Sequence, residues 1–573
     1  MQPFDFTTLS AALPELVKRW IPARVEQVRQ EDSHTVKLLL RTFEGQRWLV
    51  LSAHPEAARL HFGGSSRDKA AKFPFGATLY QYVAGKVLVS CVRTPWERIV
   101  RLRFARRPQE EPEVDLIIEV MGKYSNLILT DTQERILTLA HAVTREQSRV
   151  RPLQIGEQYT LPPPLAGPSP SRAERFEDWH ARLEYIAGPV AQALIKTYRG
   201  VSKTLVLQLL NAAGLDAQQR TAEVTDAQWQ RIHALWNEWL VCLEQEHFSP
   251  GLGRDGYTVL GWGAHTPSDS VHTLLERYYT EQLQRQTFAQ HRQRLQQVIR
   301  AALAKAKKRQ TEFERMMADA RQVDHYKLQA DLLMANLQRA KPGLKEITLA
   351  DFTSEMPVSI RLDPAKDLVA NAQRYYRLHR KAKRANQAVE PLLNDAVRRV
   401  AYLEQVAATV ELLEDAEIDL DALTEVEEEL AQEGYLSPVR TVARTEEVPF
   451  HQFPLVSGPV VLVGRNNRRN DQLTFQVAGM EDLWFHAQEI PGSHVLLKLA
   501  PGQAANPEEI QWAANVAAHF SRARLSKQVP VVYTERKYVR KLKGGGPGLV
   551  TYREEQVIWG NPDALPLPSL TEA

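Results

Sequence analysis

The sequence predicts a multidomain α+β protein. A β-rich N-terminal domain, a helical domain, a long antiparallel coiled-coil arm and an α/β C-terminal module are expected in that order. Three observations lead to this prediction: the 573 residues are enough for several domains of ~150 residues each, short β-like runs fill the first part, and two long helical stretches fill the middle. The predicted domains are 1–170, 171–270, 271–440 and 441–563.

Bulk composition is that of an ordinary globular protein, with 43% apolar and 25% charged residues. The net charge is only +3, because 72 basic residues face 69 acidic ones. Two cysteines exclude a disulfide scaffold and a cysteine-rich zinc site. The N-terminus has no basic segment followed by an apolar core, and no run of about 18 apolar residues occurs. We therefore expect a soluble, cytoplasmic protein.

The N-terminal domain is predicted to be β-rich because short runs of strand-forming residues recur along it. These runs are Thr35–Leu40, Trp48–Ser52, Lys86–Cys91, Ile99–Phe104, Asp115–Val120 and Asn126–Asp131. The proline-rich stretch 162–170 is expected to be a stiff linker that ends the domain.

Residues 172 to about 250 have helical character, with Gly200 between two helical runs and Gly214 as a stop. A glycine at such a place resembles a helix-hairpin-helix turn, which can hold a phosphate at the start of the second helix. An ordinary turn of a helical bundle fits the same residues equally well.

Two stretches, 274–340 and 366–434, are rich in Gln, Arg, Leu, Ala and Glu, and each is long enough for a helix of ~90 Å. A short non-helical cap that contains Lys341-Pro342-Gly343 and 358–362 lies between them, so an antiparallel coiled coil is predicted. Its charge is uneven: residues 374–384 hold six Lys or Arg and no acid, and residues 411–430 hold ten acids and no base.

Six arginines surround one acid in the N-terminal domain: Arg93, Glu97, Arg98, Arg101, Arg103, Arg106 and Arg107. Arginine makes bidentate contacts with phosphate. Alternation in the predicted strand places Val100 and Leu102 on one face and Arg101 on the other. On residues alone, a solvated strand face explains the pattern without a ligand.

The C-terminal module combines amides, histidines and a tryptophan in under forty residues. A β-like run at Val461–Val463 leads into a turn rich in hydrogen-bond donors, residues 465–471, which we call the donor turn. A second strand-like run is expected at Leu473–Val477. Asp482, Trp484 and His486 alternate, so they share one strand face. Side chains of these kinds hydrogen-bond to and stack on nucleotides. Tryptophan on a strand is more often part of a core, and the absence of a cysteine or third histidine argues against a metal.

A basic stretch from Arg522 to Lys543 follows, with eight Lys or Arg, one acid (Glu535) and two interleaved tyrosines. Basic residues between aromatic ones suit contact with an RNA backbone and its bases.

These motifs, taken in order, resemble the NFACT family over nearly the whole chain. The family's Asp-x-Trp-x-His set is matched by Asp482, Trp484 and His486, and its Glu-Ile-Met-Gly-Lys-x-Ser-Asn turn by residues 119–126. Its tRNA-contacting Asp-Arg pair corresponds to Glu97-Arg98, with a longer acid. Its Leu-Arg-Lys run corresponds to Leu79-Tyr80-Gln81, so two positive charges are missing.

The resemblance implies two sets of contacts. The tRNA-binding residues would be Glu97, Arg98, Glu119, Val120 and Met121. The RNA-binding residues of the C-terminal module would be Arg465, Asn466, Asn467, Asn470, Asp482, Trp484, His486, His494, Lys537, Lys541 and Lys543.

The resemblance also implies a ribosome-associated quality-control factor without a catalytic residue, metal or cofactor. Such a factor binds a stalled large ribosomal subunit (through its rRNA) with peptidyl-tRNA and recruits alanyl-tRNA for alanine tailing. Two alternatives remain. One is a fibronectin-binding adhesin, which the lack of a leader opposes. The other is a DNA glycosylase-like enzyme, opposed by Met1-Gln2-Pro3 in place of an N-terminal proline.

Overall fold

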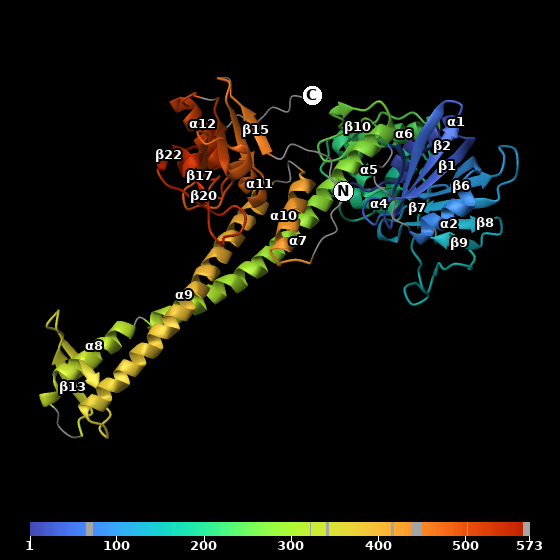
Figure 1. Ribbon diagram of the computed structural model, residues 1–573. Coiled ribbons are helices and arrows are strands. Elements are labelled where there is room, and N and C mark those ends of the chain that lie inside the picture. The colour runs from blue at the N-terminus through green and yellow to red at the C-terminus, as the bar shows by residue number, and fades with distance from the viewer. Residues whose placement is uncertain are drawn as a thin grey trace. The chain divides into compact units, whose positions relative to one another are not determined.

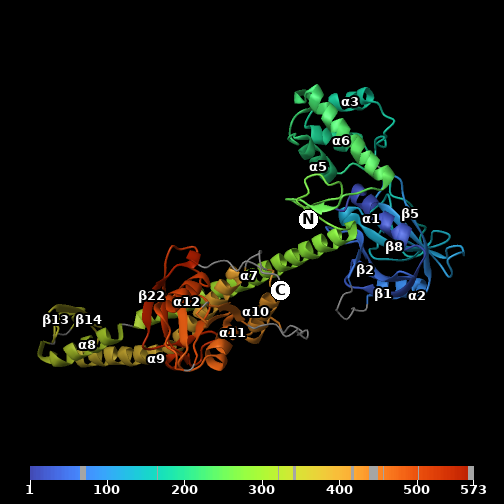
Figure 2. The same cartoon turned by 90° about the horizontal axis from the view of Figure 1, so that it is seen from above.

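The computed structural model divides into two compact units, residues 1–284 and 285–573 (Figures 1 and 2). It describes residues 1–64, 73–163, 166–320, 322–339, 343–413, 418–437, 450–455, 457–500 and 502–564. Parts of the expected proline-rich linker and of the expected cap, the predicted boundary near residue 440 and the tail after 564 lie outside these residues.

The first unit contains a nine-stranded antiparallel sheet in the order β4-β3-β2-β1-β5-β6-β7-β8-β9. All six runs predicted from the sequence are strands of this sheet. The strands are β1 (Ala23–Gln30), β2 (Thr35–Thr42), β3 (Gly45–Ser52), β4 (Arg59–Gly63), β5 (Val87–Arg93), β6 (Ile99–Ala105), β7 (Val114–Glu119), β8 (Asn126–Asp131) and β9 (Ile136–Leu139).

Alternation along the strands divides this sheet into two faces, as the sequence predicts for β6. Val100, Leu102 and Phe104 are buried in the main core of the unit, and Arg101 and Arg103 point to the other face. Helices α1 (Phe6–Arg19) and α2 (Pro74–Val83) contribute apolar side chains to the same core.

The helical part of the first unit shares that core. Its helices are α3 (Phe176–Glu184), α4 (Val190–Thr197), α5 (Lys203–Ala213) and α6 (Asp226–Gln245), followed by the small strands β10 (Gly251–Leu252), β11 (Tyr257–Thr258) and β12 (Thr266–Pro267). Trp179, Trp236 and Trp239 belong to the cluster that also contains Leu102 and Phe104. The expected boundary near residue 170 therefore separates two parts with one continuous core.

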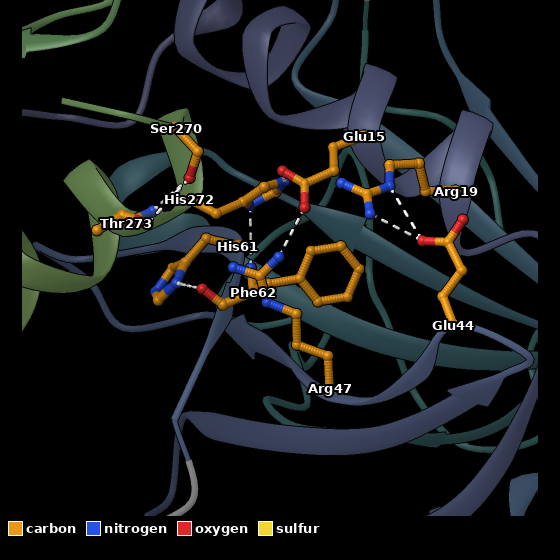
Figure 3. A network of polar contacts seen from close by, with 9 residues as sticks. All are labelled: Glu15, Arg19, Glu44, Arg47, His61, Phe62, Ser270, His272 and Thr273. Atoms are coloured by element: carbon orange, nitrogen blue, oxygen red, sulfur yellow. Dashed lines mark hydrogen bonds and ion pairs between the residues drawn. The ribbon is translucent and has the colours of Figure 1, made fainter.

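Helix α7 (Val271–Ala320) begins against the sheet of the first unit (Figure 3). The His272 Nδ1 accepts the Phe62 backbone N–H at 3.0 Å. Burial, together with nearby Arg47, lowers the pKa of His272 to about 3, so the imidazole is neutral and can accept this bond. Arg47 lies over the Phe62 ring and pairs with Glu15 at 2.6 Å. The hydrogen bond ties the first turn of α7 to β4, and Arg47 links β4 and β3 to α1 beside it.

The second unit begins with the arm, in which α7 and α9 (Leu368–Leu412) run antiparallel side by side. Phe288 and Leu295 of α7 pack with Leu403 and Val406 of α9 in one cluster, which confirms the coiled-coil pairing. In the described residues, α8 (Gln322–Ala335) follows α7 in the first long stretch, and α10 (Leu420–Gln432) follows α9 in the second. At the far end, β13 (Glu346–Ala350) and β14 (Pro357–Arg361) form a hairpin.

A six-stranded sheet in the order β15-β16-β18-β17-β19-β22 closes the second unit. Its strands are β15 (Phe450–Pro454), β16 (Val460–Gly464), β17 (Leu483–Ala487), β18 (Val495–Lys498), β19 (Val529–Glu535) and β22 (Gln556–Gly560), and β20 (Arg540–Lys541) pairs with β21 (Val550–Thr551). Helix α12 (Pro507–His519) packs on one face.

One sequence prediction in this module is wrong. Leu473–Val477 is π-helical and continues α11 (Asn467–Gln472), although its residues have strand composition. Leu-Thr-Phe-Gln-Val alternates apolar and polar residues as a strand does, but five residues are too few to exclude a helical turn with one buried side. Here Leu473 packs with Phe450, Leu462 and Leu496.

Within the described residues, no helix is both long and apolar enough to cross a membrane.

Candidate RNA interface

Backbone pairing brings two sequence motifs together at one end of the N-terminal sheet. Arg98 precedes β6, and its carbonyl accepts the Val120 N–H at 3.0 Å just after β7. The turn that follows is closed by the Met121 N–H, which donates to Ser125 Oγ at 2.8 Å. The Glu97-Arg98 pair therefore lies beside the Met121 turn.

Most of the arginines in this region are neutralised. Four of them form ion pairs: Arg101 with Asp115 at 2.8 Å and Glu134 at 2.9 Å, Arg103 with Asp115 at 3.3 Å, Arg106 with Glu113 at 2.7 Å and Arg107 with Glu110 at 3.8 Å. Arg93 instead donates to the Ser10 hydroxyl and lies over the Phe6 ring. Among the described residues, the partly exposed Arg98 guanidinium has no hydrogen bond or ion pair. Arg98 is thus the arginine of this group that remains available to an anion.

Trp96 anchors the turn that carries Glu97 and Arg98, because its ring packs against the core of the unit. This residue has a left-handed backbone, with φ of 57°, and its ring stacks on Phe6 at 4.9 Å between centroids. It also meets Trp239 of α6 edge-on at 5.9 Å. A Cβ added to Gly200 would lie 2.9 Å from the Trp96 ring, so the glycine allows the close approach of the α4–α5 turn. Packing against Trp96 therefore accounts for Gly200 without a phosphate.

The three residues of the Glu-Val-Met motif differ in their exposure. Glu119 is 1% exposed, and its carboxylate accepts from Arg151 Nη1 at 2.9 Å and from the Tyr159 hydroxyl at 2.8 Å. Val120 belongs to the main core, and Met121 is partly exposed. In this conformation Glu119 and Val120 present no surface to a tRNA. The expected contact set therefore reduces to Glu97, Arg98 and Met121, and the other two residues hold the site together.

In the C-terminal module, Asp482, Trp484 and His486 have the expected common face, but they are not equally accessible. Buried Asp482 accepts the Gly479 N–H at 2.7 Å and the Leu499 N–H at 3.0 Å. Trp484 is fully buried, and its ring is parallel to His486 at 5.7 Å. Only His486 is partly exposed.

His486 and His494, the two histidines beside Trp484, are neutral at pH 7. Burial lowers the pKa of His486, and burial together with the neighbouring imidazole of His486 lowers the pKa of His494 to about 3. His494 is fully buried, and its backbone N–H donates to Asn470 Oδ1 at 3.0 Å. These contacts hold the aromatic cluster in place, and direct RNA contact is not open to His494 here.

The donor turn faces the acidic helix α10. Arg465 pairs with Asp419 and Arg469 with Glu425, while Asn467 Nδ2 donates to Glu429 Oε1 at 3.1 Å. Asn466 caps α11 by accepting the Arg469 N–H at 2.9 Å, and its amide donates to Glu425. The acid-rich stretch predicted from 411–430 therefore binds the donor turn predicted for RNA. Asn466, Asn467 and Asn470 are buried.

The lysines of the basic stretch remain at the surface. Lys537 pairs with Glu535, and Lys541 with Asp471 at 2.6 Å. Lys543 is exposed and has no ion pair among the described residues. An open cleft of about 520 Å³ lies between Lys541, Phe475, Arg468 and Glu428. Together with the partly exposed His486, these lysines and this cleft are the parts of the predicted RNA surface that face solvent.

Sequence motifs do not single out Trp559, which is 58% exposed on the edge strand β22. Strand register pairs His486 with Val532, Val532 with Val557, and Pro530 with Trp559, so Trp559 extends the His486 face. The sequence signal that could have indicated Trp559 is the alternation along β22, in which Val557 and Trp559 lie on one face and the half-buried Ile558 on the other.

Comparison with known proteins gives the class of the chain. Residues 5–447 match the NFACT N-terminal and middle domains, and residues 449–552 match the NFACT protein RNA binding domain. The chain belongs to the NFACT family.

Within this family, the chain is similar to proteins named Rqc2 homolog RqcH. The Bacillus subtilis (strain 168) protein is 28% identical over 571 residues, which cover 96% of each chain. The Streptococcus pneumoniae R6 protein is 27% identical over 581 residues and all of both chains. Among solved structures, the C-terminal part of the Streptococcus suis fibronectin/fibrinogen-binding protein is 29% identical, with a TM-score of 0.38; it covers 48% of this chain and 96% of its own.

Proposed function

We propose that this protein is a ribosome-associated quality-control factor of the RqcH kind. It binds large ribosomal subunits that are obstructed by peptidyl-tRNA and recruits alanyl-tRNA, so that alanine is added to the nascent chain without mRNA. The peptide bond forms in the ribosome, and the protein contributes by positioning substrates. The similarity to RqcH proteins over 96% of each chain supports this role.

The observation that carries the tRNA-binding part of the proposal is the state of Arg98. Its neighbours are paired with acids or packed on rings, whereas the Arg98 guanidinium has no partner among the described residues. An arginine held beside a fixed turn and left unpaired is suited to bidentate contact with a phosphate.

In the C-terminal module, the surface proposed to contact RNA consists of His486, Lys537, Lys541 and Lys543. The buried members of the predicted set, above all Trp484 and His494, support this surface from inside. Arg465 and the asparagines of the donor turn hold the module on α10.

Affinity purification of the full chain from cells, followed by sequencing of the bound RNA, tests the proposal. Large-subunit rRNA together with a tRNA enriched for alanine isoacceptors is expected, and recovery should fall steeply as salt is raised. A chain that recovers neither RNA at low salt would exclude this function. Recovery of fibronectin, or cleavage of damaged DNA, would instead favour one of the two alternatives.

A further inference from the structure

Three histidines from distant parts of the sequence meet beside the turn that follows β7 in the N-terminal sheet. His34 precedes β2, His54 follows β3, and His141 follows β9. His34 Nδ1 and His141 Nε2 lie 2.8 Å apart, within hydrogen-bonding distance. The His34 ring is 4.7 Å from that of His141 and 5.3 Å from that of His54, between centroids. The three imidazoles therefore form one cluster.

The Glu-Val-Met-Gly-Lys-Tyr-Ser-Asn motif holds this cluster in place. Its last residue, Asn126, accepts the His141 N–H at 3.0 Å and donates to the His141 carbonyl at 2.7 Å. Its Gly122 lies next to the His54 loop, since a Cβ there would be 3.8 Å from the Pro55 carbonyl oxygen. From Arg98 to His141 the sheet advances by three strand spacings, or ~14 Å. One bound RNA segment can therefore reach both.

The cluster has unused hydrogen-bonding capacity. All three residues are partly exposed. His34 Nδ1 and His141 Nε2 hydrogen-bond to each other, and His54 Nδ1 accepts the Glu56 N–H at 3.2 Å. The remaining nitrogens, His34 Nε2, His54 Nε2 and His141 Nδ1, have no partner among the described residues. Within those residues, no three His, Cys, Asp or Glu side chains are arranged to hold a metal.

We propose that His34, His54 and His141 bind phosphate groups of the RNA backbone and extend the Arg98 site past the turn that follows β7. This inference rests on the proposed function, because it assumes that tRNA occupies this part of the first unit. Imidazole N–H groups donate to phosphate oxygens, and a protonated imidazole adds charge to that bond.

Proton uptake follows from the surroundings of the cluster. Burial, then the charges of His34 and Arg59, lower the pKa of His54, against the opposing effect of Asp32 and Glu56. Burial and His34 also lower the pKa of His141. In the free protein His54 and His141 are therefore mainly neutral at pH 7. A phosphate favours the charged form, so binding raises these pKa values and the affinity increases as pH falls.

The test compares the full-length chain with a His34→Gln, His141→Gln double variant in binding fluorescently labelled deacylated tRNA. Affinity is measured at about pH 6 and about pH 8, at constant ionic strength and with EDTA. Wild type should bind on the order of tenfold more tightly at the lower pH, which corresponds to about one unit of pKa increase. The double variant should lose this gain and match wild type at the higher pH. His265→Gln, an exposed histidine of the same unit, is the control.

The melting temperature of each variant shows whether it is folded. If the double variant is unfolded, the single variant His54→Gln is used in its place. A pH gain that persists in the histidine variants would overturn the inference. Binding that depends on Arg98 but not on pH would overturn it while leaving the proposed function intact. No binding by wild type at either pH would overturn both.

Discussion

Replacing Glu119 with alanine distinguishes a structural residue from an RNA contact. The Glu119 side chain is 1% exposed and its partner Arg151 is 12% exposed, so this is a buried ion pair. Removal of one member leaves the other charge without compensation, which costs ~3–5 kcal/mol. The hydroxyl of Tyr159, which donates to Glu119 at 2.8 Å, also loses its acceptor, and this costs about 1–3 kcal/mol more. We expect the sheet of the first unit to be strongly destabilised.

Hydrogen–deuterium exchange of peptides from β7 and β8, followed over a urea series on the full chain, measures this effect. With an m value of ~3 kcal/mol per molar urea, the midpoint should fall by at least ~1 M. Glu134→Ala is the matched control, because Glu134 pairs with Arg101 but is 44% exposed, and its loss should cost less than ~1 kcal/mol. An unchanged midpoint with weakened tRNA binding would refute the reasoning and restore Glu119 as a direct contact.

Three further predictions concern charge. Arg98→Ala should lower tRNA affinity by on the order of tenfold in gel-shift titrations, whereas Arg107→Ala should not; equal losses would contradict a specific role for Arg98. Tyr80→Arg with Gln81→Lys adds two cations to exposed positions of α2 and should raise tRNA affinity and steepen its salt dependence; an unchanged slope would place these positions outside the interface. Burial raises the pKa of Glu429 from 4.5 to about 7, so stability of the second unit should fall by up to ~3 kcal/mol as pH rises across this interval. Urea titrations at pH 4.5 and at about pH 7 measure the free energy of unfolding, and Glu429→Gln should remove its decrease. A wild-type free energy of unfolding that does not change between these pH values would contradict the raised pKa of Glu429.

Local structure is well predicted by the sequence where the pattern is long or strongly alternating. The six strand predictions in the first unit hold because each run has at least two β-branched or aromatic residues. The coiled-coil arm follows from its helical composition over many turns. Leu473–Val477 is predicted wrongly because five residues are too few to distinguish the two periods.

The candidate site is predicted less completely, since side-chain accessibility is not a local property. Trp484 and His486 share a strand face as expected, yet neighbouring rings cover one and leave the other partly open. Sequence spacing gives no sign that His34 and His141 meet, because β2 and β9 are not neighbours in the sheet and the contact depends on the three-dimensional fold.

The sequence by itself determined six strands of the first sheet, the helical arm, the family motifs and the separation of charge between the acidic stretch and the donor turn. Only the tertiary structure decided which of those charges face solvent. Arg465 and Arg469 are held by acids of α10, whereas Arg98 is left unpaired among the described residues. The reason is that an ion pair depends on distance in space, and folding brings together charges that are far apart along the chain.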